Sequence, residues 1–268
     1  MKTSALSILA TVAVIVGGAL ALGGITLSRT STDAIDDWRM QAASGHQPLA
    51  TLRLQVAQAL GNQAAKLALA QVFIAGIDER RVQRGISLLG EVAETGDTRA
   101  QLQLGRLYLK GQAGINVNYV ESRRWLAKAA TLTKPQVADA TERAEPAGPD
   151  EAPAGYAAFY LASIYRNGYG VAKDEQAAFD WLVKSASAGV PQAQFQLANV
   201  YREDGVVMRD DTKALHWLEL AGKGELPEAN LALAMAYHNG ELGLQADDNQ
   251  YWSYVKETAH DYKHQIVQ

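Results

Sequence analysis

The chain has 268 residues, 48% of them apolar, and this length is ample for one sizeable domain. It has no cysteine, which excludes disulfides, thiolate zinc sites, a cysteine nucleophile and a lipidated N-terminal cysteine. With 25 Lys and Arg against 29 Asp and Glu, the net charge is −4. This charge argues against nucleic acid as a partner, because phosphate binding needs a concentrated basic surface. Alanine and leucine dominate the apolar residues, which favours helices.

The first predicted element is the apolar segment at residues 5–27, in a stretch without charge between Lys2 and Arg29. As a helix it would be about 34 Å long, enough for a hydrocarbon core of about 30 Å. We therefore predict that residues 1–28 form a signal anchor, a single transmembrane helix. A cleaved signal peptide is the alternative, because residues 19–21 follow the small-x-small rule of cleavage sites.

The positive charges that flank this segment are nearly balanced, with Lys2 before it and Arg29 and Arg39 after it. The short tail followed by a long apolar run resembles a bacterial signal anchor, which places the N-terminus inside. We therefore expect a single-pass protein of the inner membrane whose remaining residues are periplasmic or extracytoplasmic. If the signal is cleaved, the protein would be periplasmic or secreted.

An internal repeat organises the rest of the chain. A nine-residue pattern, Ala-x-Phe-x-Leu-Ala-x-Ile-Tyr at residues 157–165, recurs in close variants at 193–201 and 229–237, with a period of 36 residues. Related copies lie at 100–108 and, in weaker form, at 65–73. A glycine follows each copy, and then an Asp or Asn precedes a second helical stretch that contains an aromatic residue and small residues.

Each position of the repeat has a role in folding. Small residues at pattern positions 1 and 6 let a neighbouring helix approach, while the ring at position 9 and an aromatic residue of the second helix fill the space between the pair. The glycine should end the first helix as a left-handed C-cap, and the Asp or Asn should cap the second helix. The residues in these roles are the glycines Gly76, Gly111, Gly168, Gly205 and Gly240, the caps Asn118, Asp174 and Asp210, and the aromatics Trp125, Trp181 and Trp217.

The pattern resembles the Sel-one-like repeat, a relative of the tetratricopeptide repeat, and the resemblance is most specific at residues 157–189. It is looser in the first copy and in the loop of the last. The resemblance implies an all-α fold, a right-handed α-solenoid of antiparallel helix pairs, preceded here by one N-terminal hydrophobic helix. It also implies a scaffold or adaptor for other proteins, since most members have that role and many bacterial ones act at the envelope.

A proline-rich segment and a degenerate copy of the repeat mark the boundaries of the repeat array. Four of the seven prolines fall in one acidic insertion, which is either an idle linker or a partner-binding loop. We predict a linker and a degenerate capping half-repeat at 29–61, repeats 1 and 2 at 62–130, the insertion at 131–153, repeats 3 to 5 at 154–259, and a C-terminal tail at 260–268.

Two features of the sequence resemble parts of an active site, but neither is sufficient to predict one. Gly168-x-Gly170 lacks the third glycine of a dinucleotide fingerprint and follows a helix instead of a strand. His260 and His264 have the spacing of metal ligands on a helix, without the HExxH context. We therefore predict no enzyme activity, no cofactor, no metal and no small-molecule substrate.

We predict a binding face for a protein or peptide on the first helices, at pattern positions 2, 4 and 7 and at position 10, the residue after the ring. We expect positions 2, 4 and 7 to be exposed, and their side chains are mainly neutral and polar. The candidate residues are Gln101, Gln103, Arg106, Tyr160, Arg166, Gln194, Gln196, Asn199, Arg202, Asn230, Met235 and His238.

The predicted function is a membrane-tethered scaffold or adaptor of the bacterial envelope, with a protein or peptide partner and a membrane contact through residues 5–27. The alternative is an envelope structural factor or an assembly factor that binds polysaccharide or peptidoglycan. A carbohydrate surface usually needs several exposed aromatic residues, whereas most Trp and Tyr here have packing roles in the repeat.

Overall fold

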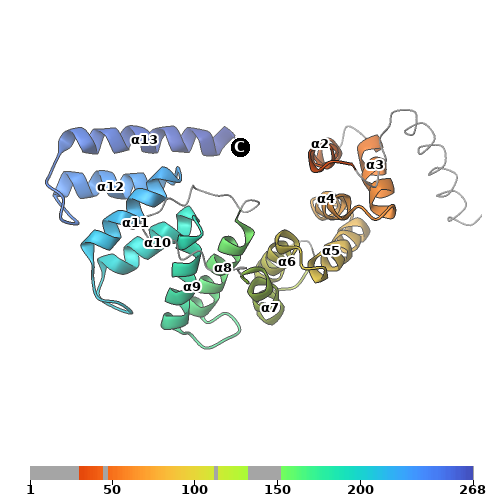
Figure 1. Cartoon of the computed structure of the whole chain (residues 1–268), viewed down its shortest axis with the longest axis horizontal. Coiled ribbons are helices and arrows are strands. Elements are labelled where there is room, and N and C mark those ends of the chain that lie inside the picture. Colours follow the sequence, from red (N-terminus) through yellow and green to blue (C-terminus); the bar gives the residue numbers. More distant parts are fainter. Residues whose placement is uncertain (1–29, 45–47, 112–113, 132–151, 268) are drawn as a thin grey trace, which may run out of the picture. The chain divides into compact units, whose positions relative to one another are not determined.

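The computed structural model describes residues 30–44, 48–111, 114–131 and 152–267. Within those ranges the chain forms twelve α-helices and no strand, which confirms the all-α prediction (Figure 1). In chain order they are α2 (Thr32–Ala43), α3 (Pro48–Ala59), α4 (Gln63–Ile74), α5 (Glu79–Glu94), α6 (Thr98–Lys110), α7 (Tyr119–Ala129), α8 (Pro153–Asn167), α9 (Glu175–Ser187), α10 (Pro191–Arg202), α11 (Asp211–Lys223), α12 (Pro227–Asn239) and α13 (Asp248–Val267).

Two predicted segments fall largely outside this description. The apolar segment at 5–27 lies entirely outside the described residues, and so does most of the insertion at 131–153. In the part that is described, none of the helices combines the length and the apolar character that a membrane span needs.

The chain divides into two compact units. Unit 1 comprises Met1–Ala100 and Gly111–Asn116, and it holds α2 to α5. Unit 2 comprises Gln101–Lys110 and Val117–Gln268, and it holds most of α6 and all of α7 to α13. The right-handed superhelix that the family resemblance implies remains a prediction.

Among the described residues, the N-terminal part of unit 1 contains two helices, whereas a half-repeat would contain one. The segment predicted as a linker and capping half-repeat, 29–61, folds into α2 and α3, which both pack on α4. The first predicted repeat, α4 with α5, is tightly packed at Gly85, where an added Cβ would lie 2.8 Å from the Ala70 carbonyl oxygen. A larger residue there would separate the two helices.

Unit 2 alternates first helices (α6, α8, α10, α12) with second helices (α7, α9, α11, α13). The pairs α8 with α9, α10 with α11 and α12 with α13 lie side by side (Figure 1). The predicted aromatic residues fill the space between helices: Trp125 and Trp217 are buried, and the half-buried Trp181 packs against the apolar core. The core therefore follows the repeat.

The predicted N-caps are confirmed. Side-chain oxygens of Asn118, Asp174 and Asp210 accept hydrogen bonds from backbone N–H groups three residues later, at 3.1, 2.9 and 3.0 Å. Gly168 and Gly240 end α8 and α12 in the left-handed conformation, with φ of 72° and 67°, as predicted. These local rules fix the starts of α7, α9 and α11 and the ends of α8 and α12.

The glycine C-cap prediction is wrong for Gly205 and Gly76. Helix α10 already ends at Arg202 with an extended C-cap residue, so the chain has left the helix before Gly205. Helix α4 has the right-handed Ala75 as its C-cap, and the Gly76 N–H donates to the Phe73 carbonyl in a tightened last turn. Gly205 therefore does not end a helix.

Residues 260–267 of the predicted C-terminal tail are helical, because α13 continues to Val267. Asp261 in this part of α13 is only 3% exposed, and its carboxylate accepts a hydrogen bond of 2.7 Å from the Asn230 amide. The end of α13 thus packs against α12 as part of the last repeat.

Candidate partner-binding groove

The predicted exposure of pattern position 2 is wrong. Gln101, Gln194 and Asn230 are 7%, 2% and 4% exposed. Positions 2 and 6 are four residues apart and share a helix face, and position 6 packs inward. The Gln194 amide accordingly donates to the Ala186 carbonyl of α9 at 3.2 Å. These three side chains have structural roles and are not accessible to a partner.

Positions 4 and 7 lie partly at the surface. Gln103, Gln196 and Asn199 are half-buried, and Met235 is 42% exposed. Tyr160 is not a free aromatic contact, because it packs against the core cluster around Leu102 and Leu161. The Arg106 guanidinium lies 5.7 Å from the centroid of the Tyr160 ring, which joins α6 to α8.

Position 10 differs from repeat to repeat. Arg166 is exposed at the end of α8. Arg202 is paired, with its Nη2 3.3 Å from Glu241 Oε2. His238 lies with Nδ1 3.6 Å from Asp248 Oδ1, and its ring centroid is 5.0 Å from that of Tyr251.

Two of the predicted residues, Arg166 and Gln196, line one pocket of about 320 Å³. It lies where α9 packs against both α8 and α10, and we call it the open groove. Its lining has an apolar floor and a polar rim. The floor consists of Ala162, Ala178, Phe179, Leu182, Val200 and Val206, and the rim of Arg166, Glu175, Gln196, Glu203, Asp204 and Gly205.

Sequence reasoning missed the second-helix and loop residues of the open groove, such as Phe179, Glu175 and Gly205. It looked for specificity only on the first helices. A comparison of the same repeat position across copies would have pointed to them. The fourth residue after the ring at position 9 is Tyr169, Gly205 and Glu241 in successive copies, and the residue after the N-cap also varies.

In the preceding copy, where α6, α7 and α8 meet, these two variable positions are both aromatic. Tyr119 follows the N-cap of α7, and Tyr169 is the fourth residue after the ring of α8. Their rings stack with centroids 5.1 Å apart and an interplanar angle of 12°. We call this the aromatic groove, because rings of the protein itself occupy it.

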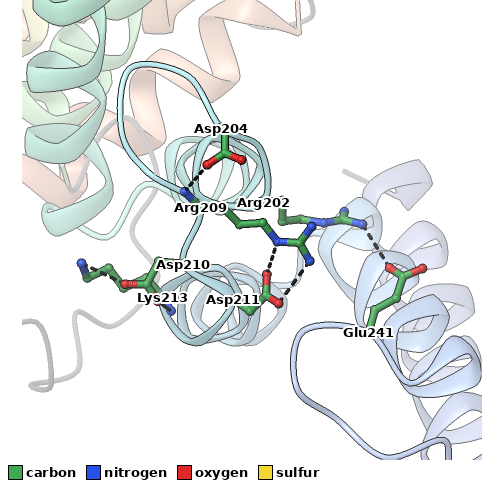
Figure 2. A network of polar contacts seen from close by, with 7 residues as sticks. All are labelled: Arg202, Asp204, Arg209, Asp210, Asp211, Lys213 and Glu241. Carbon is green, nitrogen blue, oxygen red and sulfur yellow. Dashed lines mark hydrogen bonds and ion pairs between the residues drawn. The ribbon is translucent and has the colours of Figure 1, made fainter.

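In the following copy, where α10, α11 and α12 meet, the same positions hold Asp211 and Glu241, and we call this the paired groove. Arg202 donates to Glu241, while Arg209 donates to both carboxylate oxygens of Asp211 at 2.8 and 3.1 Å. Figure 2 shows both guanidinium groups turned toward these carboxylates. The charges of this groove are therefore satisfied within the protein.

Hydrogen bonds also stabilise two aspartates at the paired groove, Asp210 and Asp211, in the charged form. The hydrogen bond from Arg209 lowers the pKa of Asp211. The backbone N–H of Lys213, followed by its side chain, lowers the pKa of the neighbouring cap Asp210. Both groups are ionised at neutral pH, where the network of Figure 2 is intact.

In the part of the chain that the structure describes, three charged residues on the rim of the open groove have no such side-chain partners. Among the described residues, none forms an ion pair or side-chain hydrogen bond with Arg166, Glu175 or Glu203. Gly205 has no side chain to reach across, and a Cβ added there would meet nothing within 4 Å. By position in the repeat, Gly205 corresponds to Glu241, the residue that pairs with Arg202 in the paired groove.

A metal site was not predicted at the C-terminal histidines, and the structure describes only one of the two side chains. His260 Nδ1 lies 3.9 Å from Asp261 Oδ1, whereas the side chain of His264 lies outside the described residues. In the part of the chain that is described, no group of three or more metal-ligating side chains comes together.

The fold defines an all-α repeat protein built from helix pairs, with a groove where neighbouring repeats meet. Residues 98–133, 155–190, 191–225 and 227–250 match the model of the Sel1 repeat family. The chain therefore carries Sel1 repeats over nearly half of its length, as the resemblance predicted. Sel1 repeats generally mediate contacts between proteins. No curated protein matches the chain.

The chain is also similar to solved structures, and the first of them shares its fold. A Sel1 repeat protein from Oxalobacter formigenes is 20% identical, with a TM-score of 0.68, and the match covers 86% of this chain and 88% of that one. A protective antigen of uropathogenic Escherichia coli with an SLR fold is 22% identical, covering 85% of this chain and 54% of its own, at a TM-score of 0.39. An immunity protein of Pseudomonas aeruginosa is 18% identical over 75% of this chain and 82% of its own, at a TM-score of 0.37.

Proposed function

We propose that this protein is a non-enzymatic adaptor of the bacterial envelope, tethered to the membrane, which binds a protein or peptide partner in the open groove. The observation that carries the proposal is the contrast between successive repeats. Two grooves are filled by the protein's own rings or ion pairs, whereas the groove between α8 and α10 presents an apolar floor and unpaired rim charges. Repeat proteins bind partners along such grooves.

The chemistry of the open groove suits a peptide segment. Apolar floors supply binding energy when a partner side chain leaves water, and a few polar groups at the rim set its orientation. The Gln196 amide can both donate to and accept from a peptide backbone, and the Arg166 guanidinium can donate several hydrogen bonds. Both residues come from the set predicted from the repeat.

The partner site is tested by closing the groove with a side chain. Gly205→Glu would place a carboxylate near Arg166, as Glu241 lies near Arg202 in the next repeat, and we expect it to reduce recovery of the partner more than tenfold. Gly90→Glu is the matched control, since Gly90 does not line the groove and a Cβ there also meets nothing within 4 Å. The measurement is recovery of crosslinked proteins from membranes by each full-length variant.

The outcome is interpreted against folding. Both variants should retain the melting temperature of the wild type within a few degrees. If Gly205→Glu recovers the same partner in the same amount as the wild type and Gly90→Glu, the open groove is not the partner site.

For the location, we propose a single-pass protein of the inner membrane with residues 5–27 as the anchor and the repeats in the periplasm. Its support is the length and apolar character of that segment in the sequence. The alternative is a periplasmic or secreted protein after signal cleavage. A topology reporter fused to the C-terminus should be active only if exported, and activity restricted to the cytoplasm would contradict the proposal.

The alternative function, binding of polysaccharide or peptidoglycan, would need several aromatic rings on one surface. The strongly exposed aromatics Trp252 and Tyr262 both lie on α13, but they are ten residues apart. On a helix that spacing rotates the two side chains away from each other by about 80° and separates them by about 15 Å. Retention of the chain on peptidoglycan without a protein partner would favour this alternative over the adaptor.

A further inference from the structure

The floor of the open groove sets the size and polarity of what it can hold. Phe179, Leu182 and Val200 dominate the floor, and the volume is about 320 Å³. An apolar cavity of about 150 Å³ is enough for a benzene molecule. The groove therefore has room for one large apolar side chain, such as Leu, Met or Phe, together with the adjoining backbone.

The rim of the groove has a surplus of negative charge. Glu175, Glu203 and Asp204 line it, all exposed, against the single cation Arg166. Asp204 Oδ1 accepts a hydrogen bond from the Arg209 backbone N–H at 3.0 Å, and its charge also interacts with the Arg209 guanidinium, so Glu175 and Glu203 are the rim carboxylates left without such a partner within the described ranges. A partner that approaches this rim meets two more carboxylates than cations.

The paired groove indicates how this chain neutralises such a rim. There, Asp211 and Glu241 are each matched by an arginine of the protein, Arg209 and Arg202. At the open groove Arg166 is the only lining residue with a positive charge. A cation on the ligand would therefore find Glu175 and Glu203 available as partners.

We infer that the segment bound in the open groove carries a large apolar side chain with a lysine or arginine within two residues of it. This inference rests on the proposed partner site and adds the chemistry of the partner. The apolar side chain enters the floor, and the basic side chain lies against Glu175 and Glu203 at the rim. Binding through exposed carboxylates should weaken as salt rises, because ions screen such pairs.

A library of random twelve-residue peptides displayed on phage tests the inference, with the detergent-solubilised full-length chain as the target. Peptides that also bind the Gly205→Glu chain are removed first, so that selection acts on the open groove. We expect the remaining peptides to converge on Leu, Met or Phe next to Lys or Arg. A synthetic peptide of that consensus should bind about tenfold more weakly to Glu175→Gln/Glu203→Gln than to the wild type.

Three results would overturn the inference: a consensus with acidic neighbours, no consensus that depends on Gly205, or equal affinity of the consensus peptide for the wild type and the double variant. The double variant must melt at the wild-type temperature, which glutamine at two exposed positions should permit. Failure of this inference about the ligand can be distinguished from failure of the proposed function. If Gly205→Glu still loses the membrane partner while the peptides lack basic residues, the groove is the site and only its chemistry is misassigned.

Discussion

The open groove and the paired groove lie at successive junctions of the repeat, and four of the twelve residues that line the open groove are the same one period later. Leu182 and Leu218 occupy the same floor position, and an arginine at pattern position 10 lines both. In the paired groove Glu241 reaches Arg202, whereas the equivalent residue in the open groove is Gly205. The comparison teaches that the repeat keeps its helix pairs while the residues at each junction change, so that one junction has a glycine where the next has a glutamate paired with an arginine.

The aromatic groove, at the preceding junction, is also occupied by the protein's own side chains. Tyr119 and Tyr169 stack there at the positions of Glu175 and Gly205. A repeat protein can therefore keep one fold along the chain and place its binding site at a single junction, by leaving that junction unfilled.

The largest effect is expected from shortening the leucine at the floor. Leu218 is fully buried beneath the paired groove, and Leu182 is buried beneath the open one. Leu218→Ala should lower the free energy of unfolding by about 4 kcal/mol and Leu182→Ala by about 2 kcal/mol, because water can enter the cavity left below an open groove. Urea unfolding of both variants measures the difference, and equal losses would mean that the two grooves are equally closed in solution.

The next effect concerns the stacked rings. Tyr119→Ala should lower the free energy of unfolding by about 1–2 kcal/mol, since it removes a stacked pair and its buried surface. If the rings act together, Tyr169→Ala should cost a similar amount, and the double variant should cost less than the two single losses added. Fully additive losses in this double-mutant cycle would show that the rings do not hold this groove shut.

A smaller effect is expected at the cap of α11, which positions the paired groove. Asp210→Ala should cost about 1 kcal/mol, because the Lys213 N–H loses its side-chain acceptor. Asp210→Asn retains an acceptor oxygen and should cost less than half as much. Thermal unfolding at neutral pH distinguishes these outcomes, and equal losses for Ala and Asn would contradict the capping role.

The smallest effect is the response of the paired groove to acid. The pKa of Asp211 is lower in the folded chain than when unfolded, owing to Arg209, so its stabilisation is present above about pH 4 and is lost as pH falls through the lowered folded pKa. Asp211→Asn should make the stability slightly less dependent on pH between about 2 and 4. The test is the melting temperature against pH for both chains, and identical curves would count against the pairing.

Most of the fold could be predicted from the sequence, because the repeat is defined by interactions between residues close together in the chain. The caps Asn118, Asp174 and Asp210 and the glycines Gly168 and Gly240 act within a few residues of their own positions. The recurring pattern then assigns α4 to α13 to pairs, whereas α2 and α3 lie outside it. Such information does not depend on where distant parts of the chain lie.

The site could be predicted only in part, because exposure depends on neighbouring repeats. Gln194 and Asn230 are polar and were therefore expected at the surface, yet each is buried with a hydrogen-bond partner on another helix. Gly205 was interpreted as a helix stop, since its neighbours in sequence resemble those of Gly168. The sequence places Gly205 at the repeat position of Glu241, but only the structure shows that Glu241 pairs with Arg202 and that Gly205 lines a pocket.

The central claim is that the partner binds at the open groove and not at its paired equivalent. A photo-crosslinking amino acid at position 196, in place of Gln196, tests it against the same replacement of Ala232, one period later in α12. We predict that irradiation of cells links the partner to position 196 and leaves position 232 without an adduct. A partner adduct at position 232 of equal or greater yield would contradict the account.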